Sequence, residues 1–495
     1  ATIRSGVDVH VTALDAATSY QNGQTYTILT AERGIEGQFA QAVSKSAFLD
    51  VALDQKEKQV DLKIAVKSTG PNPNEPRPNE PKPNEPEPNE PNPGTGENPN
   101  AGKPAPQVFN GVAVTGNQRD VALALNTLSQ NGPALGLYNA LLPLDADEAR
   151  GAFNQLSGEV HASAKTALIE DSRFLRNAVN DRIRAAFDDV GAPKVPVLAY
   201  GPEDKPATAA VGAIAAATIE PQPVVAWGQA FGSWSSIDGN RNSGRLDQSA
   251  GGFVTGFDAA VAESVRVGIL AGYSRSSFDV DSRLSHGSSD NYHLGIYGGG
   301  RWGDLAVRSG VAYTWHSIDT SRTVAFPGFR DRLKADYDAG TFQAFGELGY
   351  RIDMAPVAIE PFANLAYVSL HTDSFVEHGA AAALSGRSDT SDTTFTTLGL
   401  RASTALTLGG VDTKMRGMVG WQHAYGDATP NSTLGFSTGN AFSVAGTPIA
   451  ENAAVVEAGL DFALSRNANL GFTYTGQFGS GSRQNGIDAK LNVRF

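Results

Sequence analysis

The chain has 495 residues and a formal net charge of −13 at pH 7, which argues against nucleic acid as a partner. Its length is sufficient for two or three domains. The longest weakly apolar stretch, residues 207–219, is too short to span a bilayer as a helix, since spanning needs about 20 residues. Cysteine is absent, so no disulfide stabilises the fold.

Residues 1–67 show the period-two alternation of β-strands, in Val7–Val11 and again in Val60–Val66. Glycines at 23, 34 and 37 mark turns between such runs. We expect the C-terminal end of a stacked β-solenoid, with a small independent sandwich as the alternative. The chain starts within a pattern and has no signal peptide, so we interpret it as the C-terminal part of a longer precursor.

Residues 68–110 are predicted to be an extended linker. Four proline-rich units of five residues follow one another from Pro73 to Asn92. Proline removes backbone donors and blocks helix and sheet, which leaves polyproline II at roughly 3.1 Å per residue. A semi-rigid stalk is the simpler interpretation, and a ligand for proline-binding modules is the alternative.

Residues 111–223 form a helical linker region in our prediction. One helix opens near Asn117 and another near Asp145, and the apolar residues of 162–187 recur at helical spacing. The other faces of this third helix carry charges of both signs. They suit a polar barrel lumen, and they suit any solvated helix equally well.

Residues 224–495 repeat a period-two pattern that ends in Ile487–Phe495, where every odd position is apolar and every even one polar. We predict an all-β fold with a helical segment: a 12-stranded antiparallel transmembrane β-barrel with a helix in its lumen, preceded by the solenoid end. A large soluble sandwich or a secreted lectin-like fold is the alternative. The predicted strands are 224–235, 248–260, 264–278, 288–301, 304–319, 335–351, 357–372, 390–407, 411–424, 450–463, 467–478 and 485–495.

The connections between these strands alternate in length, as in outer-membrane barrels with periplasmic turns and extracellular loops. The long, polar loops are predicted at 236–247, 279–287, 320–334, 373–389 and 425–449. Aromatic residues such as Trp227, Trp302 and Trp421 gather near strand ends, where interfacial girdles lie.

Three charged residues are predicted to face the lumen and to form ion pairs there: Asp258, Glu347 and Arg401. The alternative is that they are ordinary solvated residues near strand ends. The eight histidines form no spaced metal motif, and no Gly-x-Ser-x-Gly sequence is present. We therefore predict no catalytic, cofactor or metal site in this chain.

Three segments resemble one family in its order along the chain. Residues 20–39 resemble the end of pertactin-type passenger domains, and residues 152–163 look like the segment that precedes autotransporter β-domains. Trp227–Gly232 and Gly251–Asp258 resemble the opening strands of the translocator. The chain is thus similar to the C-terminal part of a classical, type Va autotransporter.

The resemblance implies a barrel in the outer membrane of a Gram-negative bacterium that exports its own N-terminal passenger to the cell surface. No ATP is available there, so folding of the solenoid outside would bias the chain outward. The implied partners are outer-membrane lipid, the barrel-assembly machinery, periplasmic chaperones, and a host surface or matrix bound by the passenger. An outer-membrane porin-like or adhesin barrel with an appended soluble segment is the alternative.

Two sets of residues carry further expectations. Leu491, Val493 and Phe495 are the expected barrel-assembly signal, although many outer-membrane proteins have an aromatic residue where Val493 stands. Some family members cut their own linker after an asparagine, and Asn177 or Asn180 in the predicted lumen helix could serve.

Overall fold

The computed structural model describes residues 1–11, 23–67, 107–192, 197–199, 224–463 and 468–493. The chain forms two compact units. The first unit comprises residues 1–153 with the loop tips 326–329 and 435–442. The second comprises residues 154–325, 330–434 and 443–495, and it contains the barrel.

The N-terminal strands of the first unit pair in parallel. β1 (Val9–Val11) lies beside β3 (Ala42–Ser44), with Val9 opposite Ala42, 33 positions later in the chain. An isolated parallel bridge joins Thr2 to Glu36, 34 positions later. Parallel pairing at a nearly constant offset is the pattern of one coil of a β-solenoid stacked on the next.

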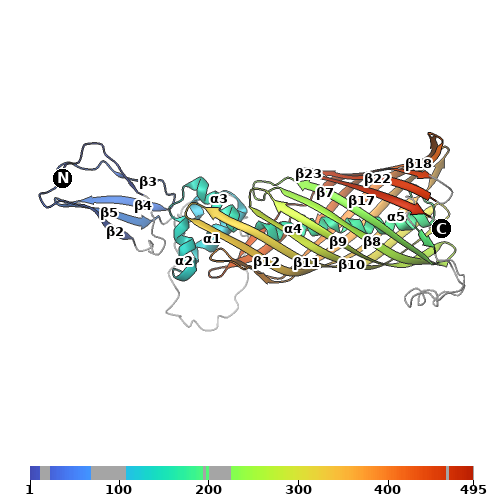
Figure 1. Ribbon diagram of the computed structural model, residues 1–495, viewed down its shortest axis with the longest axis horizontal. Helices are drawn as coiled ribbons and strands as arrows, with labels where there is room; N and C mark the ends of the chain where they lie inside the picture. The colour runs from blue at the N-terminus through green and yellow to red at the C-terminus, as the bar shows by residue number, and fades with distance from the viewer. Residues whose placement is uncertain (12–22, 68–106, 193–196, 200–223, 464–467, 494–495) are drawn as a thin grey trace, which may run out of the picture. The chain divides into compact units, whose positions relative to one another are not determined.

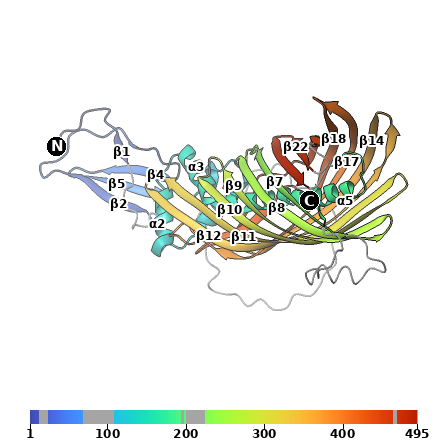
Figure 2. The same ribbon diagram turned by 45° about the vertical axis from the view of Figure 1, so that its right-hand side comes forward.

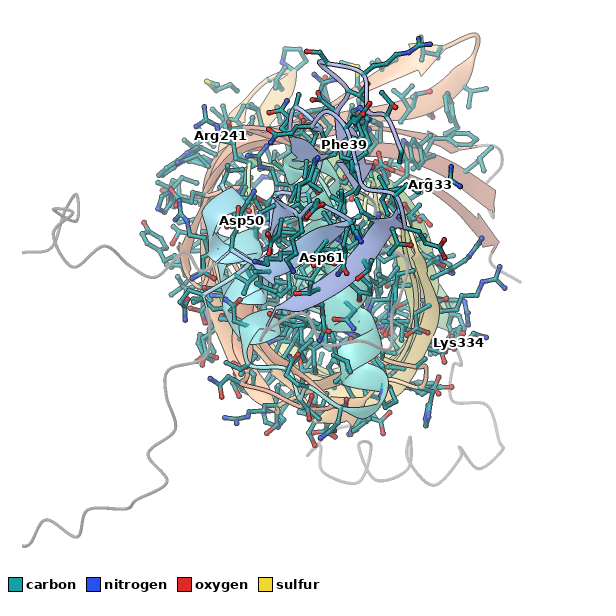
Figure 3. All side chains as sticks on the ribbon, turned by 90° about the vertical axis from the view of Figure 1, so that its left-hand side faces the viewer. Arg33, Phe39, Asp50, Asp61, Arg241 and Lys334 are labelled. Carbon is teal, nitrogen blue, oxygen red and sulfur yellow. The ribbon has the colours of Figure 1, made fainter. Side chains whose placement is uncertain are left out.

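An antiparallel sheet of three strands follows, in the order β2 (Gln24–Thr30), β5 (Gln59–Val66) and β4 (Leu49–Gln55). Asp61 on β5, labelled in Figure 3, accepts hydrogen bonds from Gln59 at 2.5 Å, Lys56 at 3.0 Å and Thr27 at 2.8 Å. These donors, with Gln59 the strongest, lower the pKa of the Asp61 carboxyl to about 2. The carboxylate thus ties three segments of the sheet together.

Helices make up the rest of the first unit, and an aromatic cluster holds them. The rings of Phe48, Tyr138 and Phe153 surround Phe109, with centroids 5.0–6.3 Å from it. The helix α2 is absent from the prediction because its sequence, GPALGLYNAL, carries two glycines and a proline. The helical elements are η1 (Asn110–Val112), α1 (Gly116–Asn126), α2 (Gly132–Leu141) and α3 (Ala146–Leu156).

The second unit is a closed barrel. Within the described residues, twelve long strands pair antiparallel in chain order, and the first, β7, pairs with the last, β23, from Ile237–Ser482 to Gly232–Ile487. A short strand, β6 (Val197–Ala199), pairs with the beginning of β7 at Val225–Trp227. The barrel strands are β7 (Val225–Ile237), β8 (Leu246–Ala262), β9 (Val265–Val280), β10 (Ser285–Trp302), β11 (Leu305–Phe326), β12 (Phe329–Tyr350), β14 (Val357–Thr372), β17 (Asp389–Leu408), β18 (Val411–Gly426), β21 (Asn452–Ala463), β22 (Ala468–Gly479) and β23 (Ser482–Val493).

The two faces of this barrel differ in polarity along each strand. On β10 the outward positions Tyr292, Leu294 and Ile296 are 54–59% exposed, whereas the alternate Asn291 and Tyr297 are buried inside. A continuous band of such apolar residues would be unfavourable in water and suits the hydrocarbon of a bilayer. The alternation that predicted twelve strands is therefore confirmed as the wall of a barrel.

Two of the predicted long loops are wrong. The segments 279–287 and 320–334 are mostly strand, with turns only at 281–284 and 327–328, because β9 to β12 continue past the apolar band. Beyond the apolar band, the outward residues of these strands are polar, as Ser317 and Asp319 are. Their inward residues, such as Ile318 and Arg322, stay buried. The apolar residues there, such as Ile318, Val324 and Leu333, face inward instead of outward, so the alternation of a lipid-facing strand is interrupted in the sequence.

Two of the other long connections, 373–389 and 425–449, carry strands of their own. A small sheet has the order β15 (Phe375–Val376), β16 (Leu384–Gly386), β19 (Asn431–Phe436) and β20 (Phe442–Ala445). A three-residue strand, β13 (Ile352–Met354), pairs with the start of β14.

Two helices run along the inside of the barrel, as Figures 1 and 2 show from two directions. They are α4 (Glu159–Asp171) and α5 (Arg173–Ala186), so the predicted single helix of 162–187 is interrupted at Ser172. The Ser172 hydroxyl donates to the carbonyl of Ile169 at 2.6 Å, and such a bond from serine back to the preceding turn bends helices. Each residue from Glu159 to Glu170 is buried, as expected for a helix enclosed on all sides.

Candidate functional site: the barrel lumen

Asp258 on β8 is the centre of the first charged cluster of the lumen and is fully buried. It accepts two hydrogen bonds from Arg182 of α5, at 2.6 and 2.8 Å, and one from Arg266 of β9 at 2.6 Å. Tyr297 of β10 donates a fourth at 2.8 Å, and its own oxygen accepts from Trp227 at 2.6 Å. Bidentate arginine–carboxylate pairing fixes orientation as well as distance, so Asp258 holds α5 against the wall.

A second cluster links Glu347 of β12 and Arg401 of β17. Arg401 donates to both carboxylate oxygens of Glu347, at 2.9 and 2.8 Å, and to Glu360 of β14 at 3.0 Å. The fully buried Arg308 of β11 donates to the same two glutamates at 2.8 and 2.9 Å, and to Asp189 at 2.7 Å. Asp189 follows α5, so this cluster also joins the lumen segment to the wall.

The helix α4 is held mainly by the long connections of the barrel. Glu159 accepts from Arg283 and from the backbone of Gly244, both at 2.6 Å. His161 lies 2.9 Å from Glu377, which pairs with Arg322 at 2.6 Å. These buried contacts come from three different connections, so they surround the helix.

Further hydrogen bonds and one close backbone contact also hold α4. Lys165 donates to Asp389 at 2.7 Å, and Thr166 donates to the carbonyl of Thr447 at 2.5 Å. Gly446 packs so closely that an added Cβ would lie 2.6 Å from the backbone of Ala162. Only glycine fits at such a distance without a shift of backbone.

The structure places all three predicted lumen residues inside the barrel and joins Glu347 to Arg401, while Asp258 lies in a separate cluster. Sequence reasoning missed Arg308 and Glu360. The signal that could have found Glu360 is the alternation of inward and outward positions along a strand. Glu360 lies directly opposite Arg401 where β14 pairs with β17. Residues opposite each other in a sheet face the same side, so an inward Arg401 implies an inward Glu360.

The expected cleavage residues both lie in the middle of α5. Asn177 lines an internal cavity, and the Asn180 amide donates to Glu347 at 3.5 Å. Of the expected assembly signal, Leu491 and Val493 belong to β23, where they are opposite Leu470 and Ala468. Phe495 lies outside the described residues.

No helix in the described ranges is long and apolar enough to cross a membrane. Among the same residues, no group of three or more histidine, aspartate or glutamate side chains is arranged to hold a metal ion.

A closed antiparallel barrel with an apolar outer band and a polar interior filled by a helix defines an outer-membrane β-barrel protein. Residues 226–475 match the autotransporter β-domain family. The chain belongs to the autotransporter family. Its barrel lies in the outer membrane of a Gram-negative bacterium and is a translocator that exports an N-terminal passenger to the cell surface.

Two curated relatives share the sequence over nearly the whole chain. Both are named extracellular serine protease, from Serratia marcescens, and they are 35% and 33% identical over 480 and 477 residues. The matched regions cover 96% of this chain and 43% of each relative. The chain thus spans less than half the length of these relatives.

Solved structures show a similar arrangement at low identity. The translocator domain of autotransporter NalP from Neisseria meningitidis has a TM-score of 0.49 and 15% identity, covering 68% of this chain and 100% of that one. The transport unit of autotransporter AIDA-I from Escherichia coli has a TM-score of 0.41 and 14% identity, covering 56% and 91%.

Proposed function

We propose that residues 154–192 mark the export route and remain in the barrel as its plug and as the tether of the passenger. The observation that carries this proposal is the bidentate pairing of Arg182 with Asp258, which holds α5 inside the lumen. Because the passenger side of the chain precedes α4 and the barrel follows α5, the linker must enter the pore at one end and leave it at the other.

The proposal assigns a role to each remaining part of the chain. Residues 1–67, in which β1 and β3 pair with the offset of a solenoid coil, are the end of the passenger and fold first outside the cell. Folding there buries apolar surface, which makes return through the pore unfavourable and biases export outward without ATP. Residues 68–110, of which 68–106 lie outside the described residues, are the spacer between passenger and barrel in this proposal.

Conductance in planar bilayers tests the plug. Deleting residues 1–190 should raise single-channel conductance severalfold, whereas deleting only residues 1–110 should leave it low, because α4 and α5 remain. Equal conductance of the two truncated barrels would contradict the proposed position of the plug. Heat-modifiable mobility on gels confirms in parallel that each barrel is folded.

Surface protease on intact cells separates the translocator from a porin-like barrel with a periplasmic appendage. An epitope within residues 1–67 should be lost from intact cells if the segment is exported. Protection of the epitope, with loss only after the outer membrane is opened, would favour the porin-like alternative.

We further propose that the exported activity is proteolysis, in line with the names of the two relatives. Its catalytic residues would lie in the passenger rather than in the barrel or the linker. Culture supernatant of cells that express the complete gene should then degrade casein. Phenylmethylsulfonyl fluoride should abolish this activity, and resistance to the inhibitor would point to another class of passenger.

Barrel assembly and linker cleavage remain predictions of this proposal. Deleting Phe495 should lower the yield of barrel in the outer membrane, since a terminal aromatic residue is the expected signal to the assembly machinery. Cleavage after Asn177 or Asn180 would give a barrel that starts at Ala178 or Asp181, which mass spectrometry of the purified protein would detect.

A further inference from the structure

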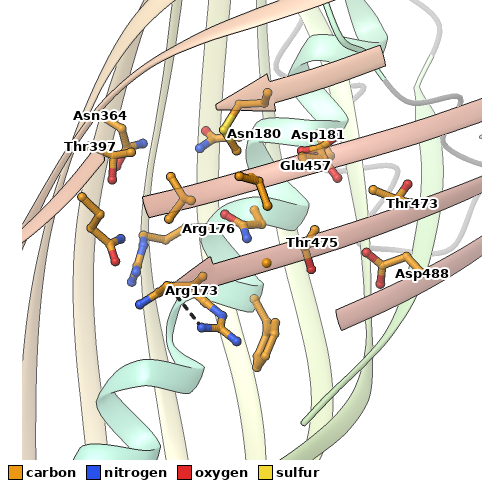
Figure 4. A pocket seen from close by; sticks show the side chains of 18 of the residues that line it. Arg173, Arg176, Asn180, Asp181, Asn364, Thr397, Glu457, Thr473, Thr475 and Asp488 are labelled. Atoms are coloured by element: carbon orange, nitrogen blue, oxygen red, sulfur yellow. Dashed lines mark hydrogen bonds between the residues drawn. The ribbon is translucent and has the colours of Figure 1, made fainter. Parts of the chain in front are cut away.

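A cavity of about 140 Å³ lies inside the barrel beside α5 (Figure 4). It is bounded by α5 on one side and by inward residues of β18, β21 and β22 among others on the opposite side. A cavity of this size holds several water molecules or one hydrated ion. Residues that line it include Arg173, Arg176, Asn177, Gln477, Thr475 and Glu457.

Arg173 and Arg176 point into one side of this cavity, as Figure 4 shows, while Asp181, Glu457 and Asp488 lie toward the other side. The two arginines are three residues apart on α5 and therefore share one helix face. Two like charges at this spacing repel each other, so their proximity needs a compensating partner.

The partners of Arg176 are neutral. It is 6% exposed, donates to Ser172 at 2.7 Å and to Gln343 at 3.2 Å, and stacks 5.5 Å from the ring of Phe395. Within the described part of the chain, no carboxylate lies within 4.0 Å of its guanidinium. Arg173 donates to Gln477 at 3.2 Å and lies 3.7 Å from Glu170, which is a loose ion pair.

Other buried arginines of the lumen differ from Arg176 in this respect. Arg182 pairs with Asp258 at 2.6 Å, and Arg308 and Arg401 pair with glutamates at 2.8 Å. The carboxylates on the far side of the cavity are also engaged, since Glu457 pairs with Arg416 and Asp181 with Arg184. A buried charge without a counter-charge in contact is unfavourable. Of the two arginines on this side of the cavity, Arg173 has only the loose pair with Glu170, and Arg176 has no carboxylate in contact among the described residues.

We propose that this cavity binds a small tetrahedral oxyanion of the sulfate or phosphate class between Arg173 and Arg176. The planar fork of a guanidinium matches two oxygens of such an anion, and two forks on one helix face present donors to several oxygens together. The anion neutralises the arginines when α5 is seated in the lumen. This site is additional to the export function, and its test does not depend on export.

Anomalous diffraction with selenate, a heavier analogue of sulfate, locates the anion in the wild-type full chain. Crystals soaked in selenate should give an anomalous peak within hydrogen-bond distance of both guanidinium groups. A map with no peak in the cavity, or with peaks at exposed arginines only, would overturn the proposal. Because this measurement uses the wild-type protein, it stands even if a variant fails to fold.

Sulfate titration of the protein in detergent, followed by its thermal unfolding at constant ionic strength, measures the affinity. R176Q should weaken sulfate binding about tenfold or more, the loss expected for one charge-assisted hydrogen-bonding group. R245Q, which removes an exposed arginine of the connection between β7 and β8, is the matched control and should bind sulfate like the wild type. Equal sulfate stabilisation of all three proteins, or none beyond that given by chloride, would refute the site.

Discussion

Replacing Asp258 by asparagine tests whether buried ion pairs hold the lumen helix. The carboxylate accepts four hydrogen bonds of 2.6–2.8 Å from Arg182, Arg266 and Tyr297, and it is fully buried. Asparagine has nearly the same shape but no charge, so the buried Arg182 guanidinium loses its counter-charge. Removing one partner from a buried pair costs about 3–5 kcal/mol, which we expect as the loss in unfolding free energy.

Replacing Arg182 by methionine should cost less, about 1–3 kcal/mol, because Asp258 keeps Arg266 and Tyr297 as partners. In the double variant the two losses should not add. The coupling energy between Arg182 and Asp258 is expected to be about 1–3 kcal/mol, as for residues in direct contact.

Equilibrium unfolding in urea, with the barrel folded into lipid vesicles and followed by tryptophan fluorescence, measures these free energies. Asp290→Asn is the matched control, because Asp290 pairs with Arg275 on the outer wall with 27% and 54% of their side chains exposed. The control should lose at most about 1 kcal/mol. If Asp258→Asn costs no more than the control, or if the double variant is strictly additive, the ion pair does not hold α5.

Leu294→Arg should place a charge in the apolar band and cost about 2–4 kcal/mol near the middle of the bilayer, measured by the same urea titration; a wild-type midpoint would contradict the lipid-facing assignment. Gly446→Ala should destabilise the contact with α4 by about 1–3 kcal/mol, since its Cβ would lie 2.6 Å from the Ala162 backbone. Gly232→Ala is the control, because nothing lies within 4 Å of its added atom. The heat-modifiable mobility of both variants on gels is the measurement. The pKa of the Asp61 carboxyl is lowered to about 2 from 3.8, so its stabilisation is complete above pH ~4 and is lost as the pH falls through 2. Asp61→Asn should flatten this pH dependence of protease resistance in the N-terminal sheet.

Much of the barrel follows from the sequence because each strand carries its own local signal. A strand that faces lipid on one side must alternate, and the alternation of segments such as Leu470–Thr475 shows both the existence of the strand and its inward face. The alternation no longer identifies a strand where lipid no longer covers one of its faces. Above the bilayer, around Asp319, the outward residues are polar and apolar residues such as Ile318 face inward, so the lipid-facing pattern ends and the sequence resembles a loop although β11 and β12 continue.

The helical linker illustrates the same limit. The apolar spacing of 162–187 is local and predicts a helix, but its mixed charges fit a lumen and bulk water equally well. Only the tertiary structure decides between them, by placing Arg182 against Asp258, 76 positions away in the chain. The break at Ser172 is likewise invisible in the spacing, because Ser172 itself keeps helical backbone angles.

The sequence by itself determines the strands, their inward faces and the order of the parts along the chain, since these depend on neighbouring residues and on the solvent each face meets. Only the tertiary structure decides which inward charges become partners. The pairing of Arg308 with Glu347, Glu360 and Asp189 joins three strands and the segment after α5. Partner choice depends on the closure of the barrel and on the height of each residue along its axis, and neither quantity is encoded in a local pattern.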